Sequence, residues 1–351
     1  MTVKEIAELA GVSIGTVDRV LHGRGRVALE TANRIQAIVD ASSYTPNPLA
    51  RNLKRSKPYR FCVLLPNRSE DSGYWAQAAS GIEGAADELR TFNIETELIE
   101  FDRYEPDSFK RSSVKVHASK PDGLLLAPVM PEVAKAFIES LGDSIPYAFF
   151  DADLPGTSPL CSIGQDSFQG GQLAGRLAHL FANETTAPGG QAPLYAVLNA
   201  HSEDHHIRTR RDGFLQYAEN RGMRTVVLED IGMESDREVI KALKSLLSKE
   251  GDLTGVFVTS APSHRIAEAL LTLSPERHRI VIGYDLVEEN IQGLREGRID
   301  AIISQRPETQ ARRGLMDLYR AIVLGRTVEK RVVIPIDLYL KENLHVEGER
   351  G

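Results

Sequence analysis

Apolar and polar residues alternate in two different ways along this chain of 351 residues. Up to about residue 42, apolar residues recur every three or four positions, which is the spacing of one face of a helix. From Tyr59 onward, short apolar runs alternate with amphipathic segments of helix length. We therefore predict a small all-α domain followed by a larger α/β body, whose parallel sheets carry helices on both faces.

The start of the chain predicts two short helices joined by a tight turn. Thr2 and Glu5 have the spacing of a capping box, so a helix begins at Val3. Gly11 ends this helix, and Ser13 caps a second one. The predicted apolar faces are Ile6, Ala7 and Leu9 on the first helix and Val17, Val20 and Leu21 on the second. Two such helices form either a helix-turn-helix, whose second helix enters the major groove of DNA, or an ordinary helical hairpin.

Two further helices follow in the pattern. The third is predicted over residues 28–42, with an apolar face made of Leu29, Ala32, Ile35, Ile38 and Val39. A short helix is predicted within residues 44–53, where Asn47 is placed to cap it and Pro48 takes the first helical position. Isolated helices shorter than about 12 residues are unstable in water. We therefore expect this short helix to form only against a partner and DNA.

Charge divides the chain in the same place as the hydrophobic pattern. The whole chain has 42 Lys and Arg against 49 Asp and Glu, a net charge of −7. Residues 1–60 hold 10 of these basic residues and 5 of the acidic ones, which leaves 32 and 44 for the rest. A basic domain on an acidic body indicates attraction to phosphate at one end only.

The sequence also suggests a cellular compartment. Cys62 and Cys161 lie among apolar residues, which favours buried thiols in a reducing compartment over a disulfide. We find no signal-peptide pattern and no apolar run near the ~20 residues of a membrane span. We therefore expect a soluble, cytoplasmic protein.

The body contains a series of predicted strands separated mostly by helix-length segments. The strands are predicted at residues 61–65, 96–101, 123–129, 146–150, 194–199, 225–230, 255–259, 279–284, 300–304 and 331–336. A segment rich in Thr, Pro and Gly at residues 183–193 predicts a surface loop. Parallel sheets of this kind bind ligands at the carboxyl ends of their strands, which is where we look for a site.

Three motifs occur together near the start of the chain. They are AGVSIGTVDRVLHG at residues 10–23, GRVALETANRI at residues 25–35 and YTPNPLARNL at residues 44–53. In these motifs, their order and their spacing, the chain resembles the DNA-binding headpiece of the lactose/galactose repressor (LacI/GalR) family. The resemblance implies contacts to double-stranded DNA by Thr2, Ser13, Ile14, Gly15, Thr16, Arg19, His22, Asn47, Ala50 and Leu53.

Individual positions sharpen or weaken this resemblance. Leu53 matches the leucine with which the family wedges open a base step in the minor groove, although a plain core leucine is the alternative. Ala28 stands where the family usually has a capping serine, so the third helix is expected to fray at its start. Asp18 stands where the family usually has a small hydroxyl residue. A carboxylate there repels phosphate unless Arg19 pairs with it or it accepts from a cytosine amino group.

The body resembles the two-lobed type I periplasmic-binding-protein fold that the family uses as its effector domain. The resemblance implies that the chain crosses between the lobes near residues 161–166, near Ser304 and near residues 325–329, and that the cleft between the lobes holds the ligand. It implies a helix-turn-helix domain over residues 1–45, a hinge helix and linker over 46–58 and a ligand-binding and dimerisation body over 59–351. The N-lobe then comprises about 59–163 and 305–326, and the C-lobe about 164–304 and 327–345.

Candidate ligand-binding residues follow the predicted strands. Asn67 and the pair Tyr74 and Trp75 come after the first strand, and an aromatic face there suits a sugar ring or a flat base. Trp75 packed beneath the sheet is the alternative. Asp151 follows the fourth strand directly, where a carboxylate is placed to accept from two sugar hydroxyls. Asp285 lies at a second such strand end.

The family pattern adds two candidates and one departure. An arginine followed by two residues and Gly-Phe selects Arg210 as the guanidinium that faces the ligand, and Gln305 also fits a family ligand position. The Asn-Asp pair that commonly follows the strand at residues 255–259 is replaced by Ser260, Ala261 and Pro262. The effector is therefore expected to differ from that of a common sugar repressor.

The resemblance implies a ligand-responsive transcriptional regulator that binds a roughly palindromic operator as a homodimer. Asp151, Arg210, Asp285 and Gln305, with an aromatic nearby, favour a sugar or sugar derivative as the effector. A purine-like corepressor is the alternative, and the arginine could instead serve a phosphate or carboxylate on the ligand. Whether the effector induces or corepresses is left open.

Other classes of protein fit less well. His201, His205 and His206 suggest a metal site, but no further fixed ligand accompanies them, so neither a metal nor a cofactor is predicted. An enzyme would leave the DNA-binding head without a role, and the chain has no serine elbow, P-loop or zinc motif. A free sugar-binding protein that serves a transporter would leave residues 1–58 without a use and would need an export signal.

Overall fold

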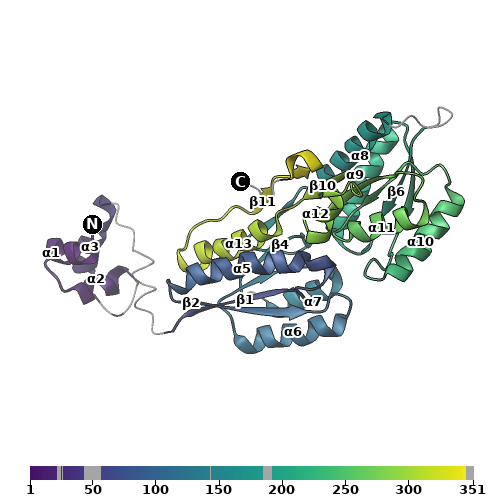
Figure 1. Ribbon diagram of the computed structural model, residues 1–351. Helices are drawn as coiled ribbons and strands as arrows, with labels where there is room; N and C mark the ends of the chain where they lie inside the picture. Colours follow the sequence, from purple (N-terminus) through teal and green to yellow (C-terminus); the bar gives the residue numbers. More distant parts are fainter. Residues whose placement is uncertain (22–24, 26, 43–56, 143, 185–191, 345–351) are drawn as a thin grey trace, which may run out of the picture. The chain divides into compact units, whose positions relative to one another are not determined.

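The computed structural model describes residues 1–21, 25, 27–42, 57–142, 144–184 and 192–344. The chain divides into two compact units, Met1–Arg55 and Ser56–Gly351 (Figure 1). The predicted short helix at residues 44–53, with Asn47, Ala50 and Leu53, lies outside the described residues, as does His22. The short helix and the DNA contacts predicted for these residues therefore stay predictions.

The first unit contains three short helices around one small core. They are α1 (Val3–Ala10), α2 (Ile14–Leu21) and α3 (Leu29–Ala41). The capping box of α1 is formed, since the Glu5 amide donates to Thr2 Oγ1 at 3.3 Å and the Thr2 amide donates to Glu5 Oε2 at 2.7 Å. Gly11 ends α1 with a φ of 64°, a left-handed conformation that glycine adopts without strain. These features confirm the predicted two-helix start.

Two side chains assigned to this core were assigned wrongly. Leu9 is 63% exposed and Leu29 is 76% exposed. The buried side chains are instead Ile6, Ala7, Ala10, Val17 and Ile35. A helix has 3.6 residues per turn, so the apolar pattern predicts the edge of the buried face only to within one position. In α1 the buried position is Ala10 and not Leu9. Ala28 makes no side-chain capping bond to α3, as its chemistry predicts.

The second unit is built on two six-stranded sheets, one in each lobe. The N-lobe sheet has the order β11-β5-β4-β3-β1-β2, and the C-lobe sheet has the order β12-β10-β9-β8-β6-β7. The N-lobe strands are β1 (Tyr59–Pro66), β2 (Ile94–Phe101), β3 (Gly123–Leu126), β4 (Tyr147–Phe150), β5 (Ser162–Gln165) and β11 (Arg331–Ile334). The C-lobe strands are β6 (Leu194–Leu198), β7 (Arg224–Leu228), β8 (Gly255–Val258), β9 (Ile280–Tyr284), β10 (Ala301–Ser304) and β12 (Asp337–Tyr339).

Helices cover both faces of each sheet, as the alternating pattern predicts. In the N-lobe, α5 (Tyr74–Arg90) lies against α13 (Pro307–Leu318), and α6 (Pro106–Ser119) packs with α7 (Pro131–Leu141) on the other side (Figure 1). In the C-lobe, α8 (Ser167–Glu184) lies against α9 (His205–Asn220). The other C-lobe helices are α10 (Asp236–Lys249), α11 (Ser263–Leu273) and α12 (Glu288–Arg295).

Glycines let each of these helix pairs approach closely, as one example from each pair shows. A Cβ atom added to Gly81 of α5 would lie 2.2 Å from the Glu308 carbonyl oxygen of α13. A Cβ atom added to Gly213 of α9 would lie 2.2 Å from the Phe168 carbonyl oxygen of α8. Both distances are far inside van der Waals contact, so a larger residue at either position forces the two helices apart.

The structure corrects three sequence-based expectations about the strands. Residues 162–165, expected only as a crossing, form the buried strand β5, whose polar ends hid it from the apolar pattern. The predicted strand 331–336 is interrupted at Pro335, which lacks an amide hydrogen for the sheet. The third crossing therefore lies between Ile334 and Asp337, not near residues 325–329, and residues 331–334 belong to the N-lobe sheet. Strand β12 is antiparallel to β10, so the C-lobe sheet is not wholly parallel.

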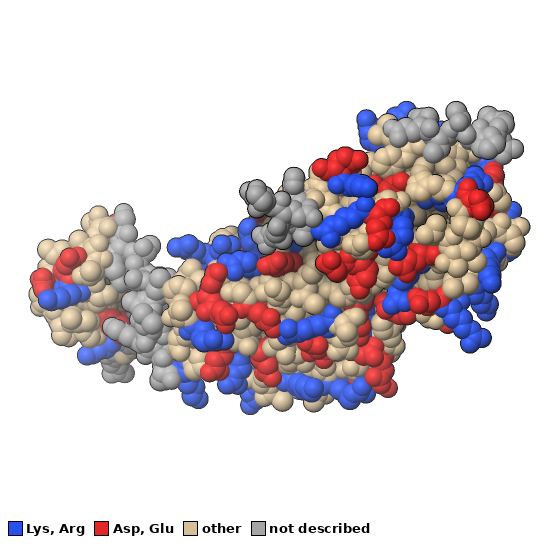
Figure 2. Space-filling model, in the orientation of Figure 1, with Lys and Arg blue, Asp and Glu red and all other residues tan. Residues whose placement is uncertain are grey.

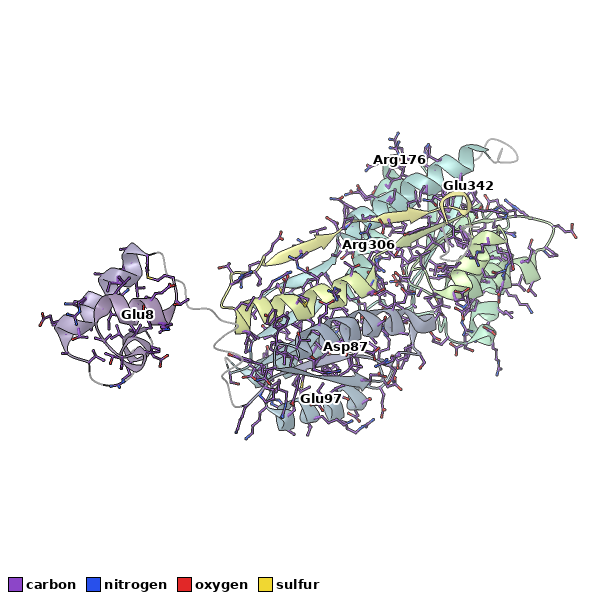
Figure 3. All side chains as sticks on the ribbon, turned by 60° about the vertical axis from the view of Figure 1, so that its left-hand side comes forward. Glu8, Asp87, Glu97, Arg176, Arg306 and Glu342 are labelled. Carbon is purple, nitrogen blue, oxygen red and sulfur yellow. The ribbon has the colours of Figure 1, made fainter. Side chains whose placement is uncertain are left out.

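Polar contacts hold the three crossings together. The side-chain amide of Gln165, at the first crossing, donates to the carbonyl oxygens of Ser304 at 3.0 Å and Pro335 at 3.4 Å. Arg306, labelled in Figure 3, lies at the second crossing with a left-handed φ of 52°. Its guanidinium forms a two-pronged ion pair with Asp337 at the third, with one N–O distance of 2.7 Å.

Two features of the chain concern its environment. Cys62 and Cys161 are buried free thiols, as predicted. Within the described ranges, none of the helices combines the length and the apolar composition that crossing a membrane requires.

Candidate functional site

The two lobes meet at equivalent strand ends, each of which carries an aspartate. Asp151 follows β4 and Asp285 follows β9, the third strand in the order of each sheet. Each amide donates to the neighbouring strand, Asp151 to the Ile163 carbonyl at 3.0 Å and Asp285 to the Ile303 carbonyl at 2.8 Å. Both aspartates have left-handed backbones, with φ of 71° and 67°. Such conformations are uncommon outside glycine and are typical of functional sites.

The N-lobe surrounds Asp151 with aromatic side chains. The Tyr74 hydroxyl donates to Asp151 Oδ1, and Trp75 Nε1 donates to Asp71 Oδ2 at 2.7 Å. Trp75 is only 1% exposed and meets Tyr74 and Phe150 edge to face. The tryptophan therefore belongs to the N-lobe core and also lines the cleft, so its two alternative roles are compatible.

The C-lobe contributes a guanidinium that is held on several sides. Arg210 is 1% exposed, and its terminal nitrogens donate to the Thr259 carbonyl at 2.9 Å and to Gln305 Oε1 at 2.6 Å. Its guanidinium carbon lies 3.9 Å from the ring centre of Tyr284, a cation–π contact. Gln305 in turn donates to Asp285 Oδ2 at 3.3 Å. Within the described part of the chain, Asp285 Oδ1 and Arg210 Nε have no hydrogen-bond partner.

A buried ion bridge joins the lobes beside these residues. The guanidinium of Arg103, which follows β2, pairs with Asp71 of the N-lobe and with Asp204 of the C-lobe. Burial opposes the charge on Asp71, but Arg103 and the nearby His201 outweigh it and lower the pKa of this carboxyl. Burial likewise opposes the charge on Arg103, but the two carboxylates raise its pKa above the usual value. Burial raises the pKa of Asp204 above its usual value, although Arg103 opposes the shift. The pair of Arg103 with Asp71 is therefore the firmly ionised half of a bridge that links the two lobes.

The remaining titratable groups are strongly affected by burial. Burial raises the pKa of Asp285 to about 7, against the opposing effect of Arg210. Burial also raises the pKa of Asp151 to about 6, although the hydrogen bond from Tyr74 opposes the shift. Burial lowers the pKa of His206 well below its usual value, and Arg210 acts in the same direction. The imidazole is therefore neutral, and burial opposes the ionisation of both carboxyl groups.

These side chains enclose a small cavity, which we call the deep pocket. Its lining residues are Asp71, Tyr74, Trp75, Arg103, Asp151, His206, Ile207, Arg210, Ser260, Ala261, Asp285 and Gln305. The cavity volume is about 20 Å³, enough for one water-sized group. Ligand pockets usually measure ~300–1,000 Å³, so a sugar-sized molecule enters only if the lobes separate.

A larger cavity, the outer pocket, lies next to the deep pocket and shares Asp71 with it. Its volume is about 300 Å³. Its lining residues are Asp71, Tyr104, Ala200, His201, Asp230, Ile231, Gly232, Met233, Glu234, Ser235, Glu238 and Pro262. Four of these side chains are carboxylates and one is an imidazole, so the outer pocket is acidic.

The structure brings most of the predicted ligand residues together. Six of the seven candidates line the deep pocket: Tyr74, Trp75, Asp151, Arg210, Asp285 and Gln305. Asn67 is not among the lining residues, and its amide donates to Glu70 Oε1 at 2.9 Å. No cluster of three or more potential metal-ligating His, Cys, Asp or Glu residues occurs in the part of the chain that the structure describes.

Three further residues of this pocket were not predicted from the sequence: Asp71, Arg103 and His206. Arg103 could have been found, because it follows the end of β2 by two residues and strand ends point into the cleft. His206 was weighed only as a metal ligand. Asp71 lies in a short turn, and nothing in its spacing distinguishes it from a solvated residue.

The first unit presents a polar helix start as a candidate DNA surface. Ser13, Ile14, Gly15 and Arg19 are exposed on α2. The Thr16 amide donates to Ser13 Oγ at 3.2 Å, which confirms the predicted cap, and Arg19 Nε donates to the Gly15 carbonyl at 3.2 Å. The backbone and cap thus fix the helix while the side chains of Ile14 and Arg19 stay at the surface. On the face of the body shown in Figure 2, basic and acidic residues are interspersed over the described surface.

The fold and the pocket define a two-lobed ligand-binding protein that carries a helix-turn-helix domain. Residues 62–327 match the periplasmic binding protein domain family. Residues 2–47 match the family described as bacterial regulatory proteins, lacI family. The chain therefore belongs to the periplasmic binding protein domain family, and its residues 2–47 carry the domain of the lacI family of bacterial regulatory proteins.

Known proteins resemble parts of the chain or its fold. The sucrose operon repressor of Klebsiella pneumoniae is 32% identical over 201 residues, which cover 55% of this chain and 57% of that protein. The ribose operon repressor of Bacillus subtilis is 29% identical over 200 residues, 55% of this chain and 56% of that protein. The chain thus spans about half the length of the curated relatives it matches. A solved structure from Bacteroides fragilis, provisionally described as a LacI transcriptional regulator, has a TM-score of 0.72 and 28% identity over 82% of this chain and 98% of its own.

Proposed function

We propose that the protein is a transcriptional repressor whose affinity for operator DNA is controlled by a small molecule bound between the lobes. The observation that carries this proposal is the presence, in one chain, of a helix-turn-helix domain and a two-lobed body with a closed polar pocket. Each part has a use only if the other responds to it. The named relatives are repressors of a sucrose and a ribose operon, which supports the same function here.

A homodimer suits this function. One helix-turn-helix domain reads only a half-site, so two copies related by a two-fold axis read a roughly palindromic operator. The exposed start of α2 supplies groups for base edges, and the basic surplus of residues 1–60 supplies attraction to phosphate. The dimer contact then belongs to the body, as the family resemblance implies.

The deep pocket is proposed as the effector site. Asp151, Asp285 and Arg210 are buried and line the same pocket. Among the described residues, Asp285 Oδ1 and Arg210 Nε have no hydrogen-bond partner, which suits a polyhydroxylated effector. Ligand binding shifts the balance between an open and a closed body only by its difference in affinity for the two. The sign of that difference decides between induction and corepression.

An activity as an enzyme has less support. The neutral imidazole of His206 and the two carboxylates could move protons, but they sit in a cavity that admits about one water-sized group. The named relatives are repressors and not enzymes. We therefore propose a binding protein that acts in the cytoplasm without a metal or a cofactor.

The test starts with selection of binding sites from randomised double-stranded DNA by the full-length protein. We expect a palindromic sequence. Arg19→Ala should then weaken binding to that sequence by about 10- to 100-fold, since one good base contact is worth ~1–3 kcal/mol.

Arg34→Ala is the matched control, because it removes the same charge from an exposed position of α3. It should weaken binding to all sequences slightly and equally. Selection without a common sequence would count against the proposal. So would equal effects of the two variants, since the start of α2 would then have no part in recognition.

A further inference from the structure

The balance of charge in the deep pocket tells which kind of effector it accepts. Two of its carboxylates have no cationic partner within ion-pair distance. Asp151 accepts from Tyr74, and its other oxygen lies 3.7 Å from Nε2 of the neutral His206. Asp285 accepts only from the side-chain amide of Gln305, and its Oδ1 has no partner among the described residues. Both side chains are at least 96% buried, so burial opposes the charge on each, and no cation among the described residues pairs with either one.

Neither arginine of the pocket forms an ion pair with Asp151 or Asp285 in the described part of the chain, although Arg210 lies near enough to oppose the rise in the pKa of both carboxyls. Arg103 is already shared between Asp71 and Asp204. Arg210 donates to a carbonyl and an amide oxygen and stacks on Tyr284, and within the described ranges it forms no ion pair. The hydroxyls of a neutral sugar would supply hydrogen bonds to the carboxylates but no charge.

The space between the lobes agrees with a small cation. The deep pocket admits one group of about the size of water, which is also the size of an ammonium group. The adjoining outer pocket has the volume for the rest of a sugar-sized molecule, and its lining adds Asp230, Glu234 and Glu238 to the shared Asp71. An anionic group on the ligand would lie near carboxylates in both pockets.

We propose that the effector carries an amine, whose ammonium group lies between Asp151 and Asp285 when the lobes close. This inference rests on the proposed function and names the class of its effector, an amino-substituted polyol such as an amino sugar. An ammonium group donates three charge-assisted hydrogen bonds and supplies the cation that the two carboxylates lack. Sugar phosphates and sugar acids are excluded by the same argument, and Arg210 is then a holder of Gln305 and not a phosphate clamp.

The test uses pairs of sugars that differ only in the amine. Binding to the full-length protein is measured by calorimetry and thermal shift for glucose and glucosamine, galactose and galactosamine, and mannose and mannosamine, with gluconate and glucose 6-phosphate as anions. We expect at least one amino sugar to bind at least about ten-fold more tightly than its neutral partner, and the anions not to bind. Tighter binding of a neutral sugar or an anion, or no binding by any amine, would overturn the inference.

Two variants with the same change of charge locate the ammonium group. Asp285→Asn keeps the shape of the side chain and should weaken the amino sugar at least about ten-fold more than its neutral partner, because the amide keeps an acceptor for a hydroxyl but has no charge for the ammonium group. Asp153→Asn, an exposed carboxylate two residues from Asp151, is the control and should change neither. Equal weakening of both sugars in Asp285→Asn would show that the carboxylate serves hydroxyls and would contradict the proposal. Asp151→Asn repeats the test if Asp285→Asn unfolds.

Failure of this inference can be told apart from failure of the proposed function. A protein that selects one DNA sequence and releases or binds it in response to a neutral sugar keeps the function and loses the amine. If the protein binds an amino sugar but selects no DNA sequence, the amine inference holds and the proposed function fails.

Discussion

The two lobes share one strand order but contribute different chemistry to the cleft. In both, the third strand ends in an aspartate with a left-handed backbone, Asp151 in the N-lobe and Asp285 in the C-lobe. The helices α5 and α9 are also equivalent, because each follows the fifth strand of its sheet, β1 or β6. Counted from the first residue of these helices, Arg210 of α9 corresponds to Ala79 of α5. The N-lobe instead surrounds its aspartate with Tyr74 and Trp75. The shared fold therefore places one aspartate at the equivalent strand end of each lobe. The side chains near the start of α5 and α9 determine which groups surround each aspartate.

The largest effect should come from breaking the bridge that spans the two lobes. Arg103→Met leaves Asp71 and Asp204 buried without their cation, which should lower the free energy of unfolding by about 3–5 kcal/mol. The double variant with Asp204→Asn removes one of the stranded charges and should recover part of this loss. Urea unfolding measures both effects. An unfolding free energy within about 1 kcal/mol of the parent for Arg103→Met would mean that the bridge is not buried in solution.

The second effect tests whether the two aspartates are equivalent. Burial raises the pKa of Asp285 in the folded protein to about 7, above the unfolded value of ~4. The stability that protonated Asp285 contributes is therefore fully present below pH ~4. It is lost as the pH rises from ~4 to ~7. Asp285→Asn should therefore gain stability relative to the parent between pH 5 and pH 8, by on the order of 2–4 kcal/mol. Asp151→Asn should show the same sign and complete its gain nearer pH 6. Parallel pH profiles of Tm for parent and variants would contradict both statements.

The third effect compares the helix pairs of the two lobes. Gly81→Ala and Gly213→Ala each place a methyl group against a carbonyl oxygen of the neighbouring helix and should cost about 1–3 kcal/mol. Gly84 is the control, since it lies exposed in the same helix as Gly81 and has no heavy atom within 4 Å of an added Cβ. Gly84→Ala should stabilise by about 0.5–1 kcal/mol through helix propensity. Stabilisation by all three substitutions would mean that the helices are not in close contact.

The smallest effect concerns an ion pair at the same N-lobe contact. Arg312 of α13 and Glu88 of α5 lie 2.8 Å apart, but both side chains are exposed. Glu88→Gln should change the free energy of unfolding by about 0.5 kcal/mol or less, because exposed pairs gain little. A loss as large as that of Gly81→Ala, measured by the same urea unfolding, would assign the contact to charge instead of packing.

The strand-end aspartates of this site could be predicted from the sequence, whereas the ion bridge between the lobes could not. Asp151 and Asp285 stand at strand ends, and strand ends are visible in the apolar pattern. The Arg103 bridge was missed because its partners come from different lobes, and which side chains face each other across a cleft depends on the packing of whole domains. Asn67 was included because it also follows a strand, yet its side chain turns to Glu70.

The strands were predicted correctly where one apolar run corresponds to one strand, and the prediction was wrong in two places where it does not. Strand β5 is short and begins and ends with polar residues, so it was assigned to a crossing. The third crossing was misplaced because the apolar run at residues 331–336 continues through Pro335, although the sheet does not. The short helix with Leu53 stays a prediction.

The contacts of Gln165 and Arg306 have a consequence for the mechanics of the body. Because these side chains tie the first, second and third connections to one another, the connections cannot shear past each other independently. We therefore expect the lobes to move relative to each other by rotation about one axis, which passes through the three joined crossings. We therefore expect a ligand that enters or leaves the cleft to rotate the whole N-lobe about this one hinge.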